Sequence, residues 1–387
     1  MEKIYLDNAS TSFPKPVCVP DAMYKYMTEI GCNINRGCYI DAYSVEKNIF
    51  ETRMLISNMF GATDCKNVIF TKNVTESLNI ILKGYLKQGD HVLVSSMEHN
   101  AVMRPLVQLE KSGISFTRIP CSETGELCLE ALPSLIKQNT KAIILTHASN
   151  VCGTVMPLAS VGKFCKEHSL KFIVDSAQTA GILPINIEEA HISALAFTGH
   201  KGLLGPQGIG GFILSEDMVE EIEPLISGGT GSISHTESIP SFMPDKFEAG
   251  TLNIPGIIGM QASLDWINTK TIDALLHHEL SLTEIFLKKL QPLEDAGQIK
   301  IIGKKDLINR TGIVSIQTLS ADQSKVAFML DSEYNIMTRV GLHCAPYAHK
   351  TLGTYPEGTI RFSFGYSNTL SEIDAAATAL EEIINGI

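Results

Sequence analysis

Short apolar runs alternate with longer amphipathic segments over much of the chain. The apolar runs cover residues 68–71, 91–96, 116–120, 142–149, 172–177, 194–197 and 210–214, and the segments 75–87, 99–111, 129–138 and 157–168 are long enough for helices. Strands that alternate with helices in this way are typical of a mostly parallel sheet with helices on both faces. Ligands of such sheets bind outside the carboxyl ends of the strands, so we expect functional residues directly after the apolar runs.

The pattern changes in the second half of the chain. Between residues 227 and 256, Gly, Ser and Pro dominate and no apolar period persists, which predicts a long functional loop. A helical segment follows at 257–292, and after it come strands at 313–319, 336–340 and 360–365 and helices at 322–331 and from 370 onward. This arrangement predicts a smaller α+β domain after the first one.

Composition and charge narrow the class of protein. The chain has 387 residues, 44% of them hydrophobic, which is enough for two domains with buried cores. Its formal net charge is −11 and no Lys/Arg run could neutralise a row of phosphates, so we expect no nucleic-acid partner. The start, MEKIYLDNAS, lacks the features of a signal peptide, and no apolar run approaches the ~20 residues of a membrane span. We therefore expect a cytoplasmic protein without a membrane partner.

The nine cysteines are scattered without a CxxC pair. Neither a disulfide framework nor a metal site is expected from this spacing. Cysteine is also a common buried apolar residue, so most of the nine are expected to be reduced core residues.

Two charged residues follow neighbouring apolar runs. Asp175 comes directly after the strand in IVDSAQ, and Lys201 follows the strand in FTGHKG. A lysine among small residues could form a Schiff base, although an isolated GHKG is more often a solvated turn. An aspartate at a strand end could hold Mg²⁺ in a nucleotide hydrolase, but the phosphate-binding loop of that class is absent. The other common use is to keep the pyridine nitrogen of pyridoxal phosphate protonated.

Two further positions fit a pyridoxal phosphate site only in context. Thr75 lies in NVTESLN, where a strand gives way to a helix, and the amides there could bind a phosphate. The same pattern is an ordinary helix cap. His99, in MEHNA after another strand, could stack on a cofactor ring or could simply pack as a polar residue.

Seven motifs in order carry a family resemblance. They are NVTESLN, MEHNA, THASNVCGT, IVDSAQ, FTGHKG, FEAGTLN and RVGLHCAP. Together they resemble the class V, fold type I pyridoxal phosphate enzymes of the cysteine desulfurase and selenocysteine lyase group, from YLDNAST to the last helix. The resemblance implies an α/β fold, with a seven-stranded, mostly parallel sheet between helices in a large domain at 16–262. It also implies a smaller α+β domain at 263–387 that carries the nucleophile loop, and an N-terminal segment at 1–15 that packs with this smaller domain.

The resemblance also implies roles for individual residues. Lys201 would hold the cofactor covalently, Asp175 would pair with the ring nitrogen, Gln178 would donate to the ring oxygen, His99 would stack on the ring, and Thr75, Thr198 and His200 would bind the phosphate. Thr251 would reach the phosphate of the other subunit, which implies a homodimer with shared active sites. Asn150 would lie near substrate and ring, Arg361 would bind the substrate α-carboxylate, and Arg339 would lie beside the substrate.

Cys344 decides the reaction that the resemblance implies. Family desulfurases convert L-cysteine to L-alanine and take the sulfur as a persulfide on a loop cysteine, which passes it to an acceptor protein or thiol. A free thiol has a pKa of about 8.5, so cationic neighbours would help to ionise it, and His343 and Arg339 are the candidates. The alternative is that Cys344 is one more buried, inert cysteine.

The sequence departs from the family pattern after the nucleophile, where Pro346 directly follows Ala345. The short spacing from Arg339 to Arg361 resembles the branch of the family with a compact nucleophile loop. That branch includes enzymes that act on L-selenocysteine, so selenocysteine lyase is an alternative function. Three more functions stay open, namely an ordinary class V aminotransferase, a kynureninase-like hydrolase and a non-catalytic carrier of pyridoxal phosphate.

Overall fold

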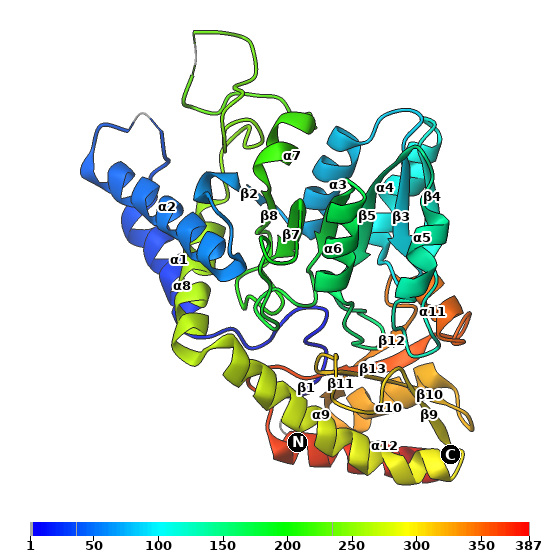
Figure 1. The fold of residues 1–387 in the computed structure, drawn as a ribbon. Helices are drawn as coiled ribbons and strands as arrows, with labels where there is room; N and C mark the ends of the chain where they lie inside the picture. The colour runs from blue at the N-terminus through cyan, green and yellow to red at the C-terminus, as the bar shows by residue number, and fades with distance from the viewer. Residues whose placement is uncertain (1–2, 36, 234, 387) are drawn as a thin grey trace.

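The computed structural model describes residues 3–35, 37–233 and 235–386. It contains a large sheet flanked by helices and a smaller part built from the C-terminal third of the chain (Figure 1). The large sheet has seven strands: β2 (Val68–Thr71), β3 (His91–Ser95), β4 (Ser115–Ile119), β5 (Thr140–Thr146), β6 (Lys171–Asp175), β7 (Ala194–Thr198) and β8 (Gly210–Leu214). Every apolar run of the first half therefore forms a strand, as predicted.

The strand order is β2-β8-β7-β6-β5-β3-β4. The neighbours from β7 to β4 are parallel, and β8 runs antiparallel to both β7 and β2. This confirms the predicted seven-stranded, mostly parallel sheet. Strands β3, β7 and β8 are buried along their whole length, because helices cover both faces of the sheet.

Three of the four expected connecting helices are present, namely α3 (Val74–Tyr85), α4 (Asn100–Glu110) and α6 (Leu158–Glu167). The fourth, expected at 129–138, was wrong in length: it is a 3₁₀ turn, η3 (Leu129–Ala131), followed by a single helical turn, α5 (Leu132–Leu135). The helix ends there because a local turn follows it. The Lys137 N–H donates a hydrogen bond to the Thr140 hydroxyl, and the Thr140 N–H donates one to the Lys137 carbonyl.

The remaining helices of the large part lie at its edge. They are α1 (Cys18–Lys25), which runs into the π-helix η1 (Tyr26–Ile30), α2 (Ile40–Phe60), the short turn η2 (Cys65–Asn67), α7 (Glu216–Glu221) and α8 (Ile254–Lys270). Helices α1 and α2 pack against α8 (Figure 1). The segment between α7 and α8 contains no regular element among its described residues, in keeping with the predicted long loop.

The smaller part is a four-stranded antiparallel sheet with helices packed on it. Its strands are β9 (Ile299–Ile302), β10 (Ile313–Thr318), β12 (Arg339–Gly341) and β13 (Thr359–Ser363), in the order β12-β13-β10-β9, and its helices are α9 (Ile272–Asp295), α10 (Gln323–Tyr334), α11 (Pro346–Thr351) and α12 (Leu370–Gly386). The helix expected at 257–292 is divided between α8 and α9, because Thr271 has a left-handed φ of 68°.

The N-terminal segment crosses from the smaller part to the large one. Strand β1 (Ile4–Tyr5) pairs in parallel with β11 (Ile336–Met337), so the strand expected at 336–340 divides between two sheets. Beyond β1, the segment runs toward the turn that carries Lys201. The division into domains at residues 15 and 262 stays a prediction, and its outermost residues, 1–2 and 387, lie outside the described residues.

Candidate functional site

Asp175 is the last residue of β6 and lies at the carboxyl edge of the sheet. It is buried, with 2% of its surface exposed, and pairs in register with Thr146 on β5. One carboxylate oxygen accepts a hydrogen bond of 2.9 Å from the Ala177 N–H. Burial raises the pKa of Asp175, while that hydrogen bond and the charge of Lys201 lower it.

Lys201 follows β7 by three residues, in the turn at its carboxyl end. Burial lowers its pKa to about 8, which the charges of Arg361 and Arg339 assist and that of Asp175 opposes. Lys201 and Asp175 therefore act on each other electrostatically in one site. An amine with this pKa is partly neutral near physiological pH and can act as a nucleophile or a base.

His99 is the N-cap of α4. Its Nδ1 accepts a hydrogen bond of 3.0 Å from the Ala101 N–H, which fixes the ring at the start of the helix. Burial, together with the positive charge of Lys201, lowers its pKa to about 4. His99 is thus a neutral ring within electrostatic reach of Lys201.

Polar atoms without partners lie at the end of β7. The Thr198 Oγ1 and the His200 Nδ1 are buried with no hydrogen-bond partner among the residues that the structure describes. The first turn of α3 approaches this strand end, since a Cβ on Gly210, which pairs with Thr198, would lie 2.9 Å from the Asn73 Cα. Thr75, in that first turn, is exposed. Unpartnered polar atoms at a strand end that a helix N-terminus approaches suit the binding of an anion.

Arg361 is almost fully buried on β13 and lies directly opposite Arg339 on β12. Its Nη1 donates to the Asn150 carbonyl at 2.9 Å, and its Nη2 donates to the Asp7 carboxylate and to the Ser10 hydroxyl, each at 2.8 Å. Its Nε is buried without a partner in the described part of the chain. The guanidinium is therefore fixed by three bonds while a further donor is left for a ligand.

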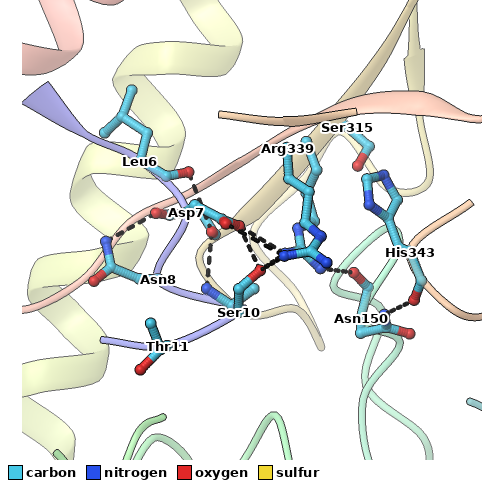
Figure 2. A network of polar contacts seen from close by, with 12 residues as sticks. Leu6, Asp7, Asn8, Ser10, Thr11, Asn150, Ser315, Arg339 and His343 are labelled. Carbon is cyan, nitrogen blue, oxygen red and sulfur yellow. Dashed lines mark hydrogen bonds and ion pairs between the residues drawn. The ribbon is translucent and has the colours of Figure 1, made fainter. Parts of the chain in front are cut away.

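Figure 2 shows this network, with Asp7 and Ser10 on one side of Arg339 and Asn150 on the other. Arg339 donates to the Ser10 hydroxyl at 3.0 Å, and its side chain is 48% exposed. The Asn150 side chain donates to the His343 carbonyl at 2.7 Å, which ties the Cys344 loop to the loop after β5.

Cys344 lies on a short turn between β12 and α11. It is exposed and has a left-handed φ of 58°, as does His343 with a φ of 47°. The Cys344 carbonyl accepts a hydrogen bond of 2.8 Å from the Asn100 N–H at the start of α4, next to His99. Pro346 begins α11, a position that proline tolerates because no helical N–H is lost there. Residues 342–345 separate β12 from α11, so the turn that carries Cys344 is short.

The expected help of His343 in ionising Cys344 was wrong. The His343 ring is buried and its Nε2 lies 2.9 Å from the Thr359 hydroxyl. Burial lowers its pKa to about 2, so the ring is neutral at physiological pH and supplies no positive charge. Of the two candidates, Arg339 is the one left to act on the thiol.

Two expected site residues, Gln178 and Thr251, are located by the cavities that they line. Gln178 donates to the Ala9 carbonyl at 3.1 Å and lines a small cavity with Lys201. Thr251 lines another cavity, of about 610 Å³, together with the buried ion pair of Arg53 and Glu248. Thr251 is exposed, and the cavity that it lines is not the one that Lys201 lines.

The sequence reasoning missed the N-terminal segment as part of the site. The His200 carbonyl accepts hydrogen bonds from the Thr11 hydroxyl, the Ser12 N–H and the Lys15 ammonium, and Ser12 also donates to the Lys201 carbonyl. The signal that could have found it is the polar run in YLDNAST directly after a short apolar strand.

Residues 3–35, 37–233 and 235–386 contain neither a metal cluster nor a membrane-spanning helix. No three His, Cys, Asp or Glu side chains in these ranges are grouped so that they could hold a metal ion. No helix formed by these residues combines the length and the apolar character that crossing a bilayer requires.

Comparisons with known proteins agree with this geometry. The class V aminotransferase family matches residues 4–376. A probable cysteine desulfurase of Methanothermobacter thermautotrophicus is 33% identical over 386 residues, covering 99% of this chain and 95% of that protein. One from Pyrococcus abyssi is also 33% identical, over 100% of this chain and 95% of that protein. The apo structure of a cysteine desulfurase from Thermococcus onnurineus is similar with a TM-score of 0.91 at 31% identity, over 100% of this chain and 95% of that one.

Proposed function

Because the chain belongs to the class V aminotransferase family and groups there with the cysteine desulfurases, we propose that it converts L-cysteine to L-alanine with pyridoxal phosphate as cofactor. The sulfur is transferred to Cys344 as a persulfide and then to an acceptor protein or thiol. The observation that carries the proposal is the anchoring of the Cys344 turn. It is bonded to the start of α4 beside His99 and to Asn150, which also holds Arg361.

The residues present fit the cofactor. Lys201 would hold it covalently, Asp175 would face its ring nitrogen, and the unpartnered Thr198 and His200 side chains would bind its phosphate with the amides of the first turn of α3. His99 would stack on the ring, and Gln178 would donate to the ring oxygen. When bound, pyridoxal phosphate supplies an electron sink for the bonds at the amino-acid α-carbon.

The chain's own residues bind and orient the substrate. Arg361 uses its remaining donors to hold the α-carboxylate, and Arg339 and Asn150 line the same end of the site. With its amine released, Lys201 accepts the α-proton at Nζ, which a pKa of about 8 permits.

Cys344 takes the sulfur. Its thiolate attacks the substrate sulfur, so an S–S bond forms while the C–S bond breaks, and the carbon keeps the electron pair and gains a proton to give L-alanine. The exposed position of Cys344 also leaves the persulfide accessible to an acceptor. Selenocysteine lyase is the second candidate, because the short loop resembles the branch of the family that acts on L-selenocysteine. The selenium of that substrate can leave without attack by a thiolate.

Substitution of Cys344 with Ala tests the reaction. We expect sulfide and alanine production from L-cysteine to fall by on the order of 100-fold or more, while the visible absorbance of the bound cofactor stays. The Lys201→Ala variant should lose both absorbance and turnover. Survival of full activity in Cys344→Ala would point to an enzyme that does not use this thiol, and equal rates on L-selenocysteine with and without the thiol would favour the lyase.

We infer that the enzyme is a homodimer in which Thr251 reaches the cofactor phosphate of the partner. Large apolar side chains are exposed on α1, η1 and α2, namely Tyr24, Met27, Ile40 and Tyr43 with 67%, 58%, 83% and 59% of their surface. Exposed apolar side chains on neighbouring helices support an interface with a second copy. Each site would combine Lys201 of one chain with Thr251 of the other. A mixed dimer of a Lys201→Ala chain and a Thr251→Ala chain therefore has one site in which both residues are intact, so mixing the two variants should restore activity. No restoration despite a confirmed dimer would exclude the sharing.

A further inference from the structure

Glu98 is a buried acidic residue between the end of β3 and the start of α4. Only 1% of its surface is exposed, and its Oε1 accepts hydrogen bonds from the Ser95 hydroxyl at 2.5 Å and from the Thr146 N–H at 2.9 Å. Its Oε2 is buried without a hydrogen-bond partner among the described residues. Because burial of an acidic group costs free energy, the two bonds indicate what Glu98 contributes in return.

The side chain of Glu98 extends the connection between β3 and β5. The register of these two strands ends at Val94 and Ile144, whereas β5 runs on to Thr146, which pairs with Asp175 on β6 (Figure 1). Beyond that register, the Thr146 N–H donates its hydrogen bond to the Glu98 side chain. Glu98 therefore joins the turn after β3 to the strand end that lies beside Asp175.

The turn that Glu98 holds is the one that carries His99. The Ser95 hydroxyl accepts from the Met97 N–H and donates to Glu98, so the turn is closed on itself. His99 follows directly, and its Nδ1 accepts from the Ala101 N–H in the first turn of α4. The position of the ring is thus set on one side by the helix cap and on the other by Glu98.

Glu98 also lies within electrostatic reach of Asp175. Burial raises the pKa of Glu98 to about 8, although the bonds from Ser95 and Thr146 lower it, and the charge of Asp175 raises it as well. Glu98 is therefore protonated at neutral pH. A neutral carboxyl group adds no second negative charge beside Asp175, and its carbonyl oxygen still accepts both hydrogen bonds.

We propose that Glu98 is a positioning residue of the cofactor site, whose hydrogen bond from Thr146 fixes the His99 ring relative to Asp175. Through these two residues it sets the orientation of the cofactor ring that both would contact. This inference rests on the proposed binding of pyridoxal phosphate at Lys201.

Two substitutions of similar size separate the hydrogen bonds from side-chain volume. Glu98→Gln keeps a neutral acceptor oxygen for Ser95 and Thr146, whereas Glu98→Leu fills a similar space without an acceptor. The readouts are the visible circular dichroism of the holoprotein, which reports how the cofactor ring is held, and the dissociation constant of pyridoxal phosphate. We expect Glu98→Leu to lower the dichroism per bound cofactor at least about twofold and to raise the dissociation constant about tenfold, and Glu98→Gln to keep both.

Two further variants serve as matched controls. Ser95→Ala removes one of the two bonds to Oε1, so it should change both readouts in the same direction as Glu98→Leu and by less. Glu110→Leu removes an exposed carboxylate at the other end of α4 and should change neither. The unfolding temperature of each apoprotein is measured alongside, because a purely structural role would lower it without altering the dichroism.

The proposal is overturned if Glu98→Leu keeps the dichroism and affinity of the unaltered protein, or if Glu98→Gln loses as much as Glu98→Leu. If Glu98→Leu does not fold, Ser95→Ala decides, and unchanged readouts in that variant overturn the proposal. A protein that binds no pyridoxal phosphate at all would overturn the proposed function as well. An unaffected Glu98→Leu holoprotein would leave that function intact.

Discussion

The backbone N–H of Asn100 donates a hydrogen bond of 2.8 Å to the backbone carbonyl of Cys344. This bond joins the first turn of α4, which His99 caps, to the turn that carries the candidate nucleophile. Cys344 and His343 both have left-handed backbone conformations, which non-glycine residues adopt only when their surroundings hold them there. We infer that the bond sets the position of the thiol relative to His99.

Asn100→Pro removes this bond selectively. Asn100 is the first residue of α4, where proline is tolerated, and the preceding His99 has φ −72° and ψ 157°, the region that a residue before proline prefers. We expect α4 and cofactor absorbance to be retained while desulfuration of L-cysteine falls by about tenfold, since the lost bond is worth about 1 kcal/mol or somewhat more. Asn100→Ala, which keeps the N–H, is the control and should stay near the unaltered rate. Equal rates in both variants would contradict the anchoring role.

The pKa of Lys201 predicts how cofactor attachment depends on pH. Only the neutral amine attacks an aldehyde, so the rate at which the apoprotein takes up pyridoxal phosphate should rise through a midpoint at about 8 rather than at the ordinary lysine value of 10.5. Asp175 raises this pKa, so Asp175→Asn should move the midpoint to lower pH. Stopped-flow absorbance measures both profiles, with the exposed Asp374→Asn as a charge control. A midpoint in Asp175→Asn at or above the unaltered value would contradict the coupling.

Arg361 should be intolerant of lysine. Its planar guanidinium holds Asn150, Asp7 and Ser10 at once and still has Nε available, whereas a lysine ammonium has three donors and no fork. We expect Arg361→Lys to lower kcat/KM for L-cysteine by about 100-fold, mostly through KM, and to leave cofactor absorbance unchanged. Arg339→Lys, at the half-exposed partner, should cost less. An unchanged KM in Arg361→Lys would argue against binding of the α-carboxylate there.

Glu279 on α9 makes the stability of the protein depend on pH. It is buried against a cavity of about 40 Å³, with no hydrogen bond to its carboxylate from the described residues. Burial raises its pKa from 4.5 to about 8. At pH values between these two, the folded protein holds a proton on Glu279 that the unfolded chain has released. Its contribution to stability is complete below pH 4.5 and falls by up to about 1.4 kcal/mol per pH unit as the pH rises toward 8.

Glu279→Gln removes this proton linkage. Thermal unfolding should show the variant as stable as the original at pH 4.5 to 5 and more stable at pH 8, because the amide never ionises. The exposed Glu284→Gln on the same helix is the control. Parallel pH profiles for Glu279→Gln and the unaltered protein would mean that Glu279 is not held neutral.

Arg53 and Glu248 form a buried ion pair beside the cavity that holds Thr251. The Arg53 Nη2 lies 2.5 Å from Glu248, whose carboxylate also accepts from the Phe70 N–H at 2.7 Å. Arg53→Met leaves a buried, uncompensated carboxylate and should destabilise the fold by about 3–5 kcal/mol. The double variant with Glu248→Gln keeps an acceptor for Phe70 and removes the charge, so it should recover most of the unfolding temperature. A double variant no more stable than Arg53→Met would show that packing rather than charge dominates.

The sequence by itself determined the large sheet and the position of Asp175 and Lys201 on it. Strands buried on both faces must be almost wholly apolar, so each appears as an unbroken apolar run and the residue that ends the run lies at the sheet edge. The ordered motifs around those edges also determined the family. Local signals of this kind are carried by residues a few positions apart, and for that reason they can be read from the chain.

Only the tertiary structure decided which residues complete the site. Asp7 and Ser10 reach Arg361 across more than 350 positions, and the Cys344 turn meets α4 through backbone atoms whose bonds leave no mark in the sequence. His343 had the right chemistry and the right position beside Cys344, but burial keeps its ring neutral. Burial and long-range contact depend on how the elements pack in three dimensions, and one residue's type or spacing does not specify them.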